Sequence, residues 1–180
     1  MTQYRRIYVP GASWFFTVNL AHKQGNHLLV EQIDLLREAF QYVKKRHPFC
    51  MDAVVIMPNH LHCIWTLPEG DSDYSLRWKL LKAFFSRGIP KGEVISSSRE
   101  RRRERGIWQR RFWAHLLTDQ EDYNQHFDYI HWNPVKHGWV KKVYEWEYSS
   151  FHRAVRSGLY TLEWGHSGEF VIDVDKLHSI

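Results

Sequence analysis

The chain has few cysteines and no long hydrophobic run. Only Cys50 and Cys63 occur among its 180 residues, so at most one disulfide can form, and neither belongs to a CxxC motif. A disulfide-stabilised scaffold and a zinc ribbon are therefore not expected. No apolar stretch approaches the roughly 20 residues of a membrane-spanning helix, and no apolar signal-peptide region follows the first residues. We expect a cytoplasmic protein with no membrane partner.

The composition is that of a folded, soluble protein. Hydrophobic residues make up 43% of the chain and charged residues 25%, which argues against a disordered chain. A chain of 180 residues is long enough to bury the core of one domain. Aromatic residues reach 16% and there are twelve histidines, so side chains that suit both binding surfaces and cores are frequent.

The net charge of +5 arises in one segment. Between Arg99 and Arg111 there are seven arginines and two glutamates, whereas the rest of the chain has 18 basic and 18 acidic residues. Three serines at positions 96–98 precede these arginines, and we interpret residues 88–111 as a basic linker. Such a segment is either a solvated, flexible loop or a binding site for phosphate groups, and composition alone does not separate the two.

Hydrophobic periodicity predicts four strands and three helices. Runs of β-branched and aromatic residues predict strands at 14–19, 52–57, 60–67 and 112–118. Apolar residues at spacings of three and four predict helices at 30–45, 75–87 and 119–131. The order βαββαβ followed by α is typical of the α+β class. We expect a ferredoxin-like antiparallel sheet with helices on one face.

His60 and His62 lie two residues apart on a predicted strand. Because side chains alternate across a strand, both imidazoles project from one face, while Leu61 points to the core. Such a pair can chelate a divalent metal, and the alternative is that both histidines are structural. Zinc would need more protein ligands, whereas a mixed nitrogen and oxygen site for Mg²⁺ or Mn²⁺ asks less of the protein.

Tyr129 and Asn133 lie four residues apart and share one face of the last predicted helix, with His126 one turn before the tyrosine. The tyrosine can serve packing or chemistry. Asn133 precedes Pro134, which disfavours the α conformation, so it can also be a residue that ends or caps the helix. The spacing alone leaves these alternatives open.

Four motifs recur in a recognisable order: MPNHLH at 57–62, WQRRFWAH at 108–115, DYIHWNPVKHG at 128–138 and WEYSSF at 146–151. Together they resemble the REP-associated tyrosine transposases, relatives of the IS200/IS605 single-tyrosine HUH transposases. The resemblance covers at least residues 4–153. We therefore expect an HUH single-tyrosine transposase domain at 1–155, containing the basic linker at 88–111, and a C-terminal tail of undetermined role at 156–180.

The resemblance implies an HUH nuclease fold in which a histidine pair holds Mg²⁺ or Mn²⁺ and a helix carries a nucleophilic tyrosine. Carried over by position, the metal ligands are His60, His62 and Asn133, and the nucleophile is Tyr129. Because position 133 is Asn, the second tyrosine of two-tyrosine HUH enzymes has no counterpart. No other cofactor is implied. The family substrate is single-stranded DNA folded into imperfect palindromic hairpins beside a guide tetranucleotide.

This reading predicts a metal-dependent endonuclease and strand transferase that acts in DNA transposition or a related rearrangement. Tyr129 would attack the phosphate and form a 5′-phosphotyrosine intermediate. An ordinary tyrosine has a pKa near 10, so a metal-bound group or a base must help to remove its proton. His126 is a speculative candidate for that base, and a surface or core role is the alternative.

Proteins that bind single strands combine cationic tracks with aromatic platforms for base stacking. The candidate DNA-binding residues are accordingly Arg101, Arg102, Arg103, Arg105, Arg110, Arg111, Trp108, Lys136 and His137. The alternative for each is solvated surface or, for the tryptophan, core. Two further functions stay open, a noncatalytic nucleic-acid-binding protein and a water-activating metal phosphodiesterase. The sequence does not distinguish a monomer from a homodimer.

Overall fold

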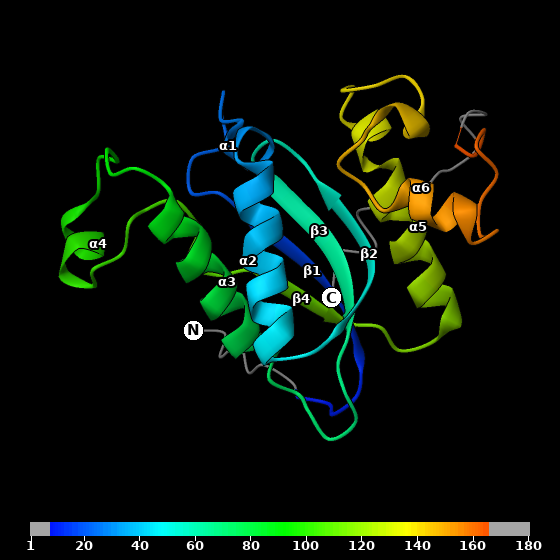
Figure 1. The fold of residues 1–180 in the computed structure, drawn as a ribbon, viewed down its shortest axis with the longest axis horizontal. Helices are drawn as coiled ribbons and strands as arrows, with labels where there is room; N and C mark the ends of the chain where they lie inside the picture. The colour runs from blue at the N-terminus through cyan, green and yellow to red at the C-terminus, as the bar shows by residue number, and fades with distance from the viewer. Residues whose placement is uncertain (1–7, 166–180) are drawn as a thin grey trace, which may run out of the picture.

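The computed structural model describes residues 8–165 and contains a four-stranded antiparallel sheet (Figure 1). Its strands are β1 (Ser13–Asn19), β2 (Cys50–Ile56), β3 (His60–Thr66) and β4 (Trp113–Leu116). Their order across the sheet is β2-β3-β1-β4, with β1 antiparallel to both of its neighbours. The predicted ferredoxin-like α+β fold is confirmed. Of the predicted C-terminal tail, residues 166–180 lie outside the described residues.

The helices predicted at 30–45, 75–87 and 119–131 are present, and three shorter helices occur in the described part of the chain that the sequence analysis did not predict. In chain order, the helices are α1 (Leu28–Glu31), α2 (Ile33–Arg46), α3 (Tyr74–Gly88), α4 (Ser97–Arg101), α5 (Gln120–Lys136), η1 (Val143–Glu145) and α6 (Phe151–Arg156). The helix predicted at 30–45 is divided at Gln32 into α1 and α2. The carboxylate of Asp73 accepts a hydrogen bond from the amide of Leu76 and so caps the start of α3. Within residues 8–165 no helix combines the length and apolar character needed to cross a membrane.

Helices α2 and α3 pack on one face of the sheet, and aromatic side chains fill the space between the sheet and these helices. The rings of Trp65 on β3 and Trp78 on α3 stack with centroids 4.2 Å apart, and Phe49 lies 4.2 Å from Trp65. Leu61 is buried in the same cluster, as the alternation along β3 requires. The large core of the domain therefore lies between the sheet and these two helices.

Helix α5 covers the opposite face, where Ile130 and Tyr129 pack against Phe15, Val55 and Ile64 of the sheet (Figure 1). The prediction of helices on one face is therefore correct for the two helices inside the βαββαβ order and incomplete for the helix that follows. A face carrying Phe15, Val55 and Ile64 is too apolar to remain in water. Helix α5, which follows β4 in the chain, covers this face.

Helix α5 is longer than predicted, because it continues through Asn133 and Pro134 to Lys136. Pro134 lacks only its own N–H, and the amide of His137 still donates to the carbonyl of Asn133 at 3.0 Å. Gly138 adopts a φ of 71° and ends the helix in the usual left-handed conformation. The interpretation of Asn133 as a residue that ends or caps the helix is therefore wrong. It is a buried residue of the last helical turns.

The segment after α5 covers the edge of strand β2. The amide of Ile56 donates to the carbonyl of Tyr148, and the indole of Trp146 donates to the carbonyl of Ile56. Ser150 accepts a hydrogen bond from the amide of Val54 and lies 2.7 Å from Nε2 of His131. The motif at 146–151 thus satisfies backbone groups of an edge strand and ties that strand to α5.

Candidate active site and nucleic-acid interface

His60 and His62 lie on β3 with their rings 5.0 Å apart, and both face the side covered by α5. Their shared face confirms the alternation expected along the strand. This face is not open to solvent, because α5 lies over it and leaves His62 only 3% exposed. Substitution of His62 therefore disturbs packing as well as chemistry.

Each of these imidazoles is oriented through its Nδ1 atom. Nδ1 of His62 shares a hydrogen bond of 2.8 Å with Oγ1 of Thr17, the residue opposite it on β1. Nδ1 of His60 shares one of 2.7 Å with Oδ1 of Asn59. Metal-ligating histidines are usually held in this way by the nitrogen that does not bind the metal. The ligand atom of each ring would then be Nε2.

His60 is neutral at neutral pH. Burial, together with the nearby His137 and Lys23, lowers its pKa to about 4, and Asn133 partly opposes the shift. A metal ligand must be a neutral imidazole, so this environment favours ligation over protonation.

Tyr129 projects from α5 toward the histidine pair. Its ring lies 5.2 Å from that of His62 and 6.0 Å from that of Phe15, and the residue is 3% exposed. Burial raises the pKa of its hydroxyl, and Asn133 partly opposes that shift. The ammonium of Lys136 lies 4.9 Å from the centroid of the ring. The phenol is therefore protonated at neutral pH, with a cation close enough to favour its ionised form.

Asn133 lies one turn after Tyr129 and is completely buried. Its amide faces both His60 and Tyr129 and affects the pKa of each, yet neither amide atom makes a hydrogen bond of good geometry within residues 8–165. Leaving a buried amide in this state costs about 1–3 kcal/mol, so a group that completes it would stabilise the protein. Two imidazole nitrogens and a carboxamide oxygen fit Mn²⁺ or Mg²⁺, with water and phosphate oxygens as the remaining ligands.

The four residues carried over by position thus meet between β3 and α5, and residues 136–137 lie beside them. The ring of His137 is 5.5 Å from that of His60, and burial followed by the charge of Lys136 lowers its pKa. His126 is placed differently. Its Nδ1 lies 3.0 Å from the carboxylate of Asp122 and its ring packs on Phe15, so the geometry does not place it as a base for Tyr129.

The basic linker is folded, and part of its charge is used internally. Arg105 forms an ion pair with Glu93 and donates to the carbonyls of Ser86 and Ile89. Arg110 pairs with Glu104 at 2.7 Å. The flexible-loop interpretation is wrong for these positions, and Arg105 acts as a clamp between α3 and the linker.

Trp108 is not available as a stacking platform. It is 6% exposed and packs edge-on against Phe85 of α3 with ring centroids 5.3 Å apart. The assignment of this tryptophan to DNA is therefore corrected, because a base cannot stack on a ring already enclosed by the core. The exposed arginines of the set are Arg101, Arg102, Arg103, Arg110 and Arg111.

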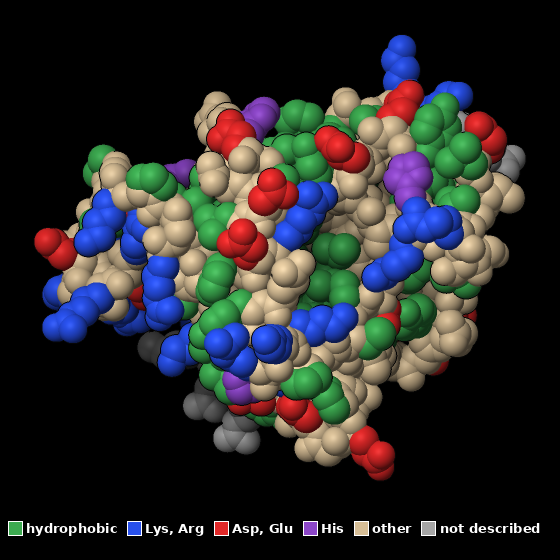
Figure 2. Space-filling model, viewed as in Figure 1, with side chains coloured by type: hydrophobic (Ala, Val, Ile, Leu, Met, Phe, Trp, Pro, Cys, Tyr) green, Lys and Arg blue, Asp and Glu red, His purple; other side chains and the backbone are tan. Residues whose placement is uncertain are grey.

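A groove of about 790 Å³ separates α3 from the linker. Lys79, Lys82 and Arg87 line it from α3, and Arg102 and Arg103 line it from the linker. Figure 2 shows Lys and Arg side chains gathered over the end of the molecule where α4 lies. The cationic surface is therefore built from two segments, and the sequence indicated only one of them.

Trp139 is a surface aromatic that the sequence analysis did not single out. It is 45% exposed, follows the turn at Gly138, and its ring lies 5.5 Å from that of His27 and 6.1 Å from that of Trp146. A tryptophan directly after the glycine that ends the helix was the available signal. Its place beside Lys136 and His137 puts an exposed ring next to the histidine and tyrosine cluster.

No protein-family model matches the chain. It is 46% identical over 164 residues to a REP-associated tyrosine transposase of Escherichia coli K12, covering 91% of each chain. A Haemophilus influenzae relative assigned to the same family is 41% identical over 176 residues, 97% of this chain and 99% of the relative. Among solved structures, a REP-associated tyrosine transposase bound to a REP hairpin matches with a TM-score of 0.79 and 46% identity, covering 92% of each chain. This chain therefore belongs to the REP-associated tyrosine transposases.

Proposed function

We propose that this protein is a metal-dependent endonuclease and strand transferase that acts on hairpin DNA containing a single-stranded scissile site. The observation that carries the proposal is the meeting of Tyr129 with His60, His62 and Asn133 between β3 and α5. A hydroxyl nucleophile next to two imidazoles and an amide oxygen is a set of groups suited to phosphoryl transfer. The solved relative in complex with a REP hairpin supports a hairpin as the substrate.

His60, His62 and Asn133 would hold the metal, Mg²⁺ or Mn²⁺. When bound, the ion supplies positive charge to a nonbridging phosphate oxygen and polarises the phosphorus. The chain contributes orientation, because Thr17 and Asn59 hold the two imidazole rings. It also contributes a neutral ligand, because burial keeps His60 unprotonated.

Tyr129 is the nucleophile in this proposal. Its hydroxyl oxygen forms a bond to phosphorus, the bond from phosphorus to the 3′ oxygen breaks, and the 3′ hydroxyl leaves. The phenol loses its proton to solvent, and the leaving 3′ oxygen takes up a proton. Lys136 favours loss of the phenol proton through its charge beside the ring. The product is a 5′-phosphotyrosine, which the 3′ hydroxyl of another strand can attack in the reverse sense.

The DNA would approach over the exposed cationic surface. Arg102 and Arg103, which line the groove, and the exposed Arg101 next to them would contact phosphates. The exposed Arg110 and Arg111 would continue that track. Near the cluster, Lys136 and His137 would contact the scissile strand. In place of Trp108, we propose Trp139 as the ring on which a base stacks, because it is exposed and adjoins them.

The test is incubation of an end-labelled REP-type hairpin with the protein and Mn²⁺, followed by denaturing gel electrophoresis. The expected result is a shortened DNA and a protein–DNA adduct that resists denaturation, with both lost in EDTA and restored by added Mn²⁺ or Mg²⁺. Cleavage without an adduct would favour the water-activating phosphodiesterase. Binding without cleavage would favour a noncatalytic DNA-binding protein.

A further inference from the structure

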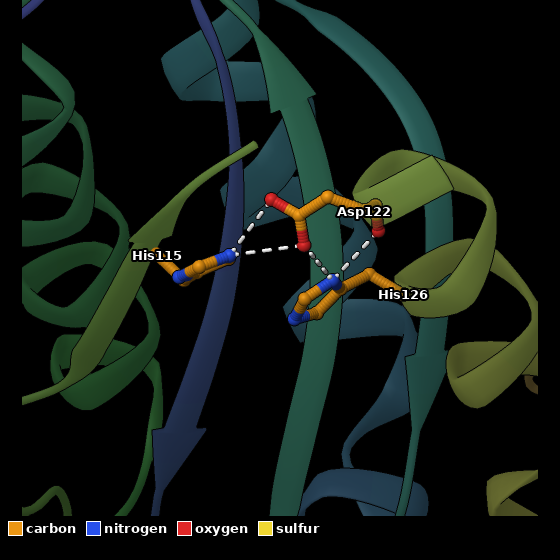
Figure 3. Close-up of side chains that lie close together, drawn as sticks. All are labelled: His115, Asp122 and His126. Carbon is orange, nitrogen blue, oxygen red and sulfur yellow. Dashed lines mark hydrogen bonds and ion pairs between the residues drawn. The ribbon is translucent and has the colours of Figure 1, made fainter. Parts of the chain in front are cut away.

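Three side chains with metal-binding atoms meet at a second place on the α5 face. His115 comes from β4, and Asp122 and His126 come from the first two turns of α5 (Figure 3). One ligand atom from each residue lies within 4.8 Å of the others. This cluster is not the site proposed for catalysis, because the ring of Phe15 lies between His126 and both His62 and Tyr129.

We propose that His115, Asp122 and His126 form a second metal site, which binds a divalent transition-metal ion of the zinc class. The proposal is independent of the proposed function. The ligand atoms would be Nε2 of His115, a carboxylate oxygen of Asp122 and Nδ1 of His126.

Two of the three distances among these atoms are close to those around a shared ion. The carboxylate of Asp122 lies 3.0 Å from Nε2 of His115 and 3.0 Å from Nδ1 of His126. Ligands bound at the zinc distances of about 2.0–2.1 Å in a tetrahedron are separated by about 3.3 Å. An ion would replace these hydrogen bonds, and at least one imidazole ring would have to rotate, because the rings of His115 and His126 stack with centroids 4.7 Å apart and planes 22° from parallel. Nδ1 of His126 would give up its contact of 2.8 Å with the carbonyl of Asp122.

Neighbouring residues orient two of the ligands, Asp122 and His115. The amide and the hydroxyl of Thr118 both donate to the carboxylate of Asp122. The ring of His115 stacks on Trp113, with centroids 5.5 Å apart and planes 4° from parallel. Ligands held by hydrogen bonds and packing lose little freedom when an ion binds.

The cluster is also accessible. The side chains of His115 and Asp122 are 21% and 17% exposed, whereas His126 is buried beneath them. An ion can therefore enter from solvent and keep a water molecule as its fourth ligand. Two imidazoles with one carboxylate are a donor set that zinc prefers over Mg²⁺.

Occupancy would link strand β4 to the beginning of the helix that carries Tyr129. The ligands come from both elements, so an ion bound only by the folded state stabilises their contact by mass action. The expected role is therefore structural support of α5.

The experiment uses full-length protein in which His60→Gln, at the less buried of the two histidines, removes a ligand from the other candidate metal site. Zn²⁺ and Co²⁺ are titrated after treatment with chelator, with calorimetry for zinc and visible absorption for cobalt. We expect one equivalent of each metal, a cobalt spectrum of four-coordinate intensity and a higher Tm with zinc. X-ray absorption of the zinc-loaded protein is expected to show two imidazoles and oxygen ligands.

Adding His115→Gln to this background is expected to weaken zinc binding beyond the roughly 10- to 100-fold typical of lost second-shell contacts. Adding His22→Gln, an exposed histidine outside the cluster, serves as the matched control and leaves affinity unchanged. The proposal is overturned if the background protein binds neither metal, or if His115→Gln leaves affinity unchanged. Should the His115 variant fail to fold, a zinc absorption spectrum without imidazole ligands overturns it instead. DNA cleavage enters none of these readouts, so failure here leaves the function of Tyr129 untouched.

Discussion

The two faces of the sheet are packed in different ways. On the α2 and α3 face, large rings such as Trp65 and Trp78 fill the space, and the buried Arg77 is fully engaged by carbonyls and by Asp71. On the α5 face, the buried residues include His62 and Asn133. The amide atoms of Asn133 make no well-formed hydrogen bond in the part of the chain that the structure describes.

The two faces therefore contribute differently, one mainly to the stability of the fold and the other to the proposed reaction. Buried polar atoms without a hydrogen-bond partner occur on both faces in the described residues, because the indole nitrogens of Trp65 and Trp78 on the α2 and α3 face also lack one. The α5 face differs in the chemistry of its buried groups, because a phenol, an imidazole and a carboxamide lie together there. The α5 face therefore carries the reaction in our proposal, while the α2 and α3 face supplies most of the core.

Tyr129→Phe has the largest expected effect. It removes the proposed nucleophilic hydroxyl from the α5 face and leaves the aromatic ring in place. Cleavage and adduct formation should fall by on the order of 10⁶, as for loss of other covalent nucleophiles, while hairpin binding and Tm change little. Denaturing gels and binding titrations measure the two effects. Tyr123→Phe, on the same helix but away from His62, is the matched control. An adduct formed by Tyr129→Phe would contradict the assignment.

Trp78→Ala tests the other face. The ring is completely buried on Trp65, so its removal should lower the free energy of unfolding by about 3–5 kcal/mol through lost burial and the cavity left behind. Denaturant unfolding measures this loss. The matched control is Trp139→Ala, which should change stability by less than about 0.5 kcal/mol because that ring is exposed. Equal losses in both variants would contradict the division between the faces.

Acid should destabilise the protein through His131, which is buried on the inner side of α5. Burial lowers its pKa to about 4, so between pH 6.5 and 4 the unfolded chain binds the proton and the folded chain does not. Stability is therefore complete above about pH 6.5 and falls as the pH is lowered toward 4. The loss from this group between pH 7 and 5 should be about 2 kcal/mol.

Urea unfolding at the two pH values measures that loss, and His131→Gln should make it smaller by the same amount. His60, whose pKa burial also lowers to about 4, adds a second contribution that this variant retains. An unchanged pH dependence in His131→Gln would show that other groups cause the acid sensitivity.

Replacing Arg101, Arg102 and Arg103 by glutamine has the smallest expected effect and tests whether the exposed cationic surface contacts DNA phosphates. If each meets a phosphate, the slope of log K against log salt should fall by about 0.7 per contact on single-stranded DNA. Preference for the correct hairpin over a scrambled strand should persist, because phosphate contacts do not read bases. Arg105→Gln is the contrasting variant, and it should lower stability while leaving the slope unchanged. An unchanged slope in the triple variant would make these arginines solvated surface.

Much of the fold was predictable because its signals are local. The period of two along β3 places His60 and His62 on one face, and the spacing of four on α5 places Tyr129 above Asn133. Both follow from backbone geometry within a few residues. The family motifs added roles for these residues that geometry alone left open.

The sequence by itself determined the strands, the helices and the residues that share a face, because the repeat of each element is set by its own backbone. Only the tertiary structure decided that α5 covers the histidine pair, that Arg105 is engaged by backbone carbonyls of neighbouring segments and that Trp108 is buried. It also decided that His115 meets Asp122 and His126, which join a strand to a helix. These outcomes depend on the side chains that other elements place against each residue, and a local sequence pattern does not specify those contacts.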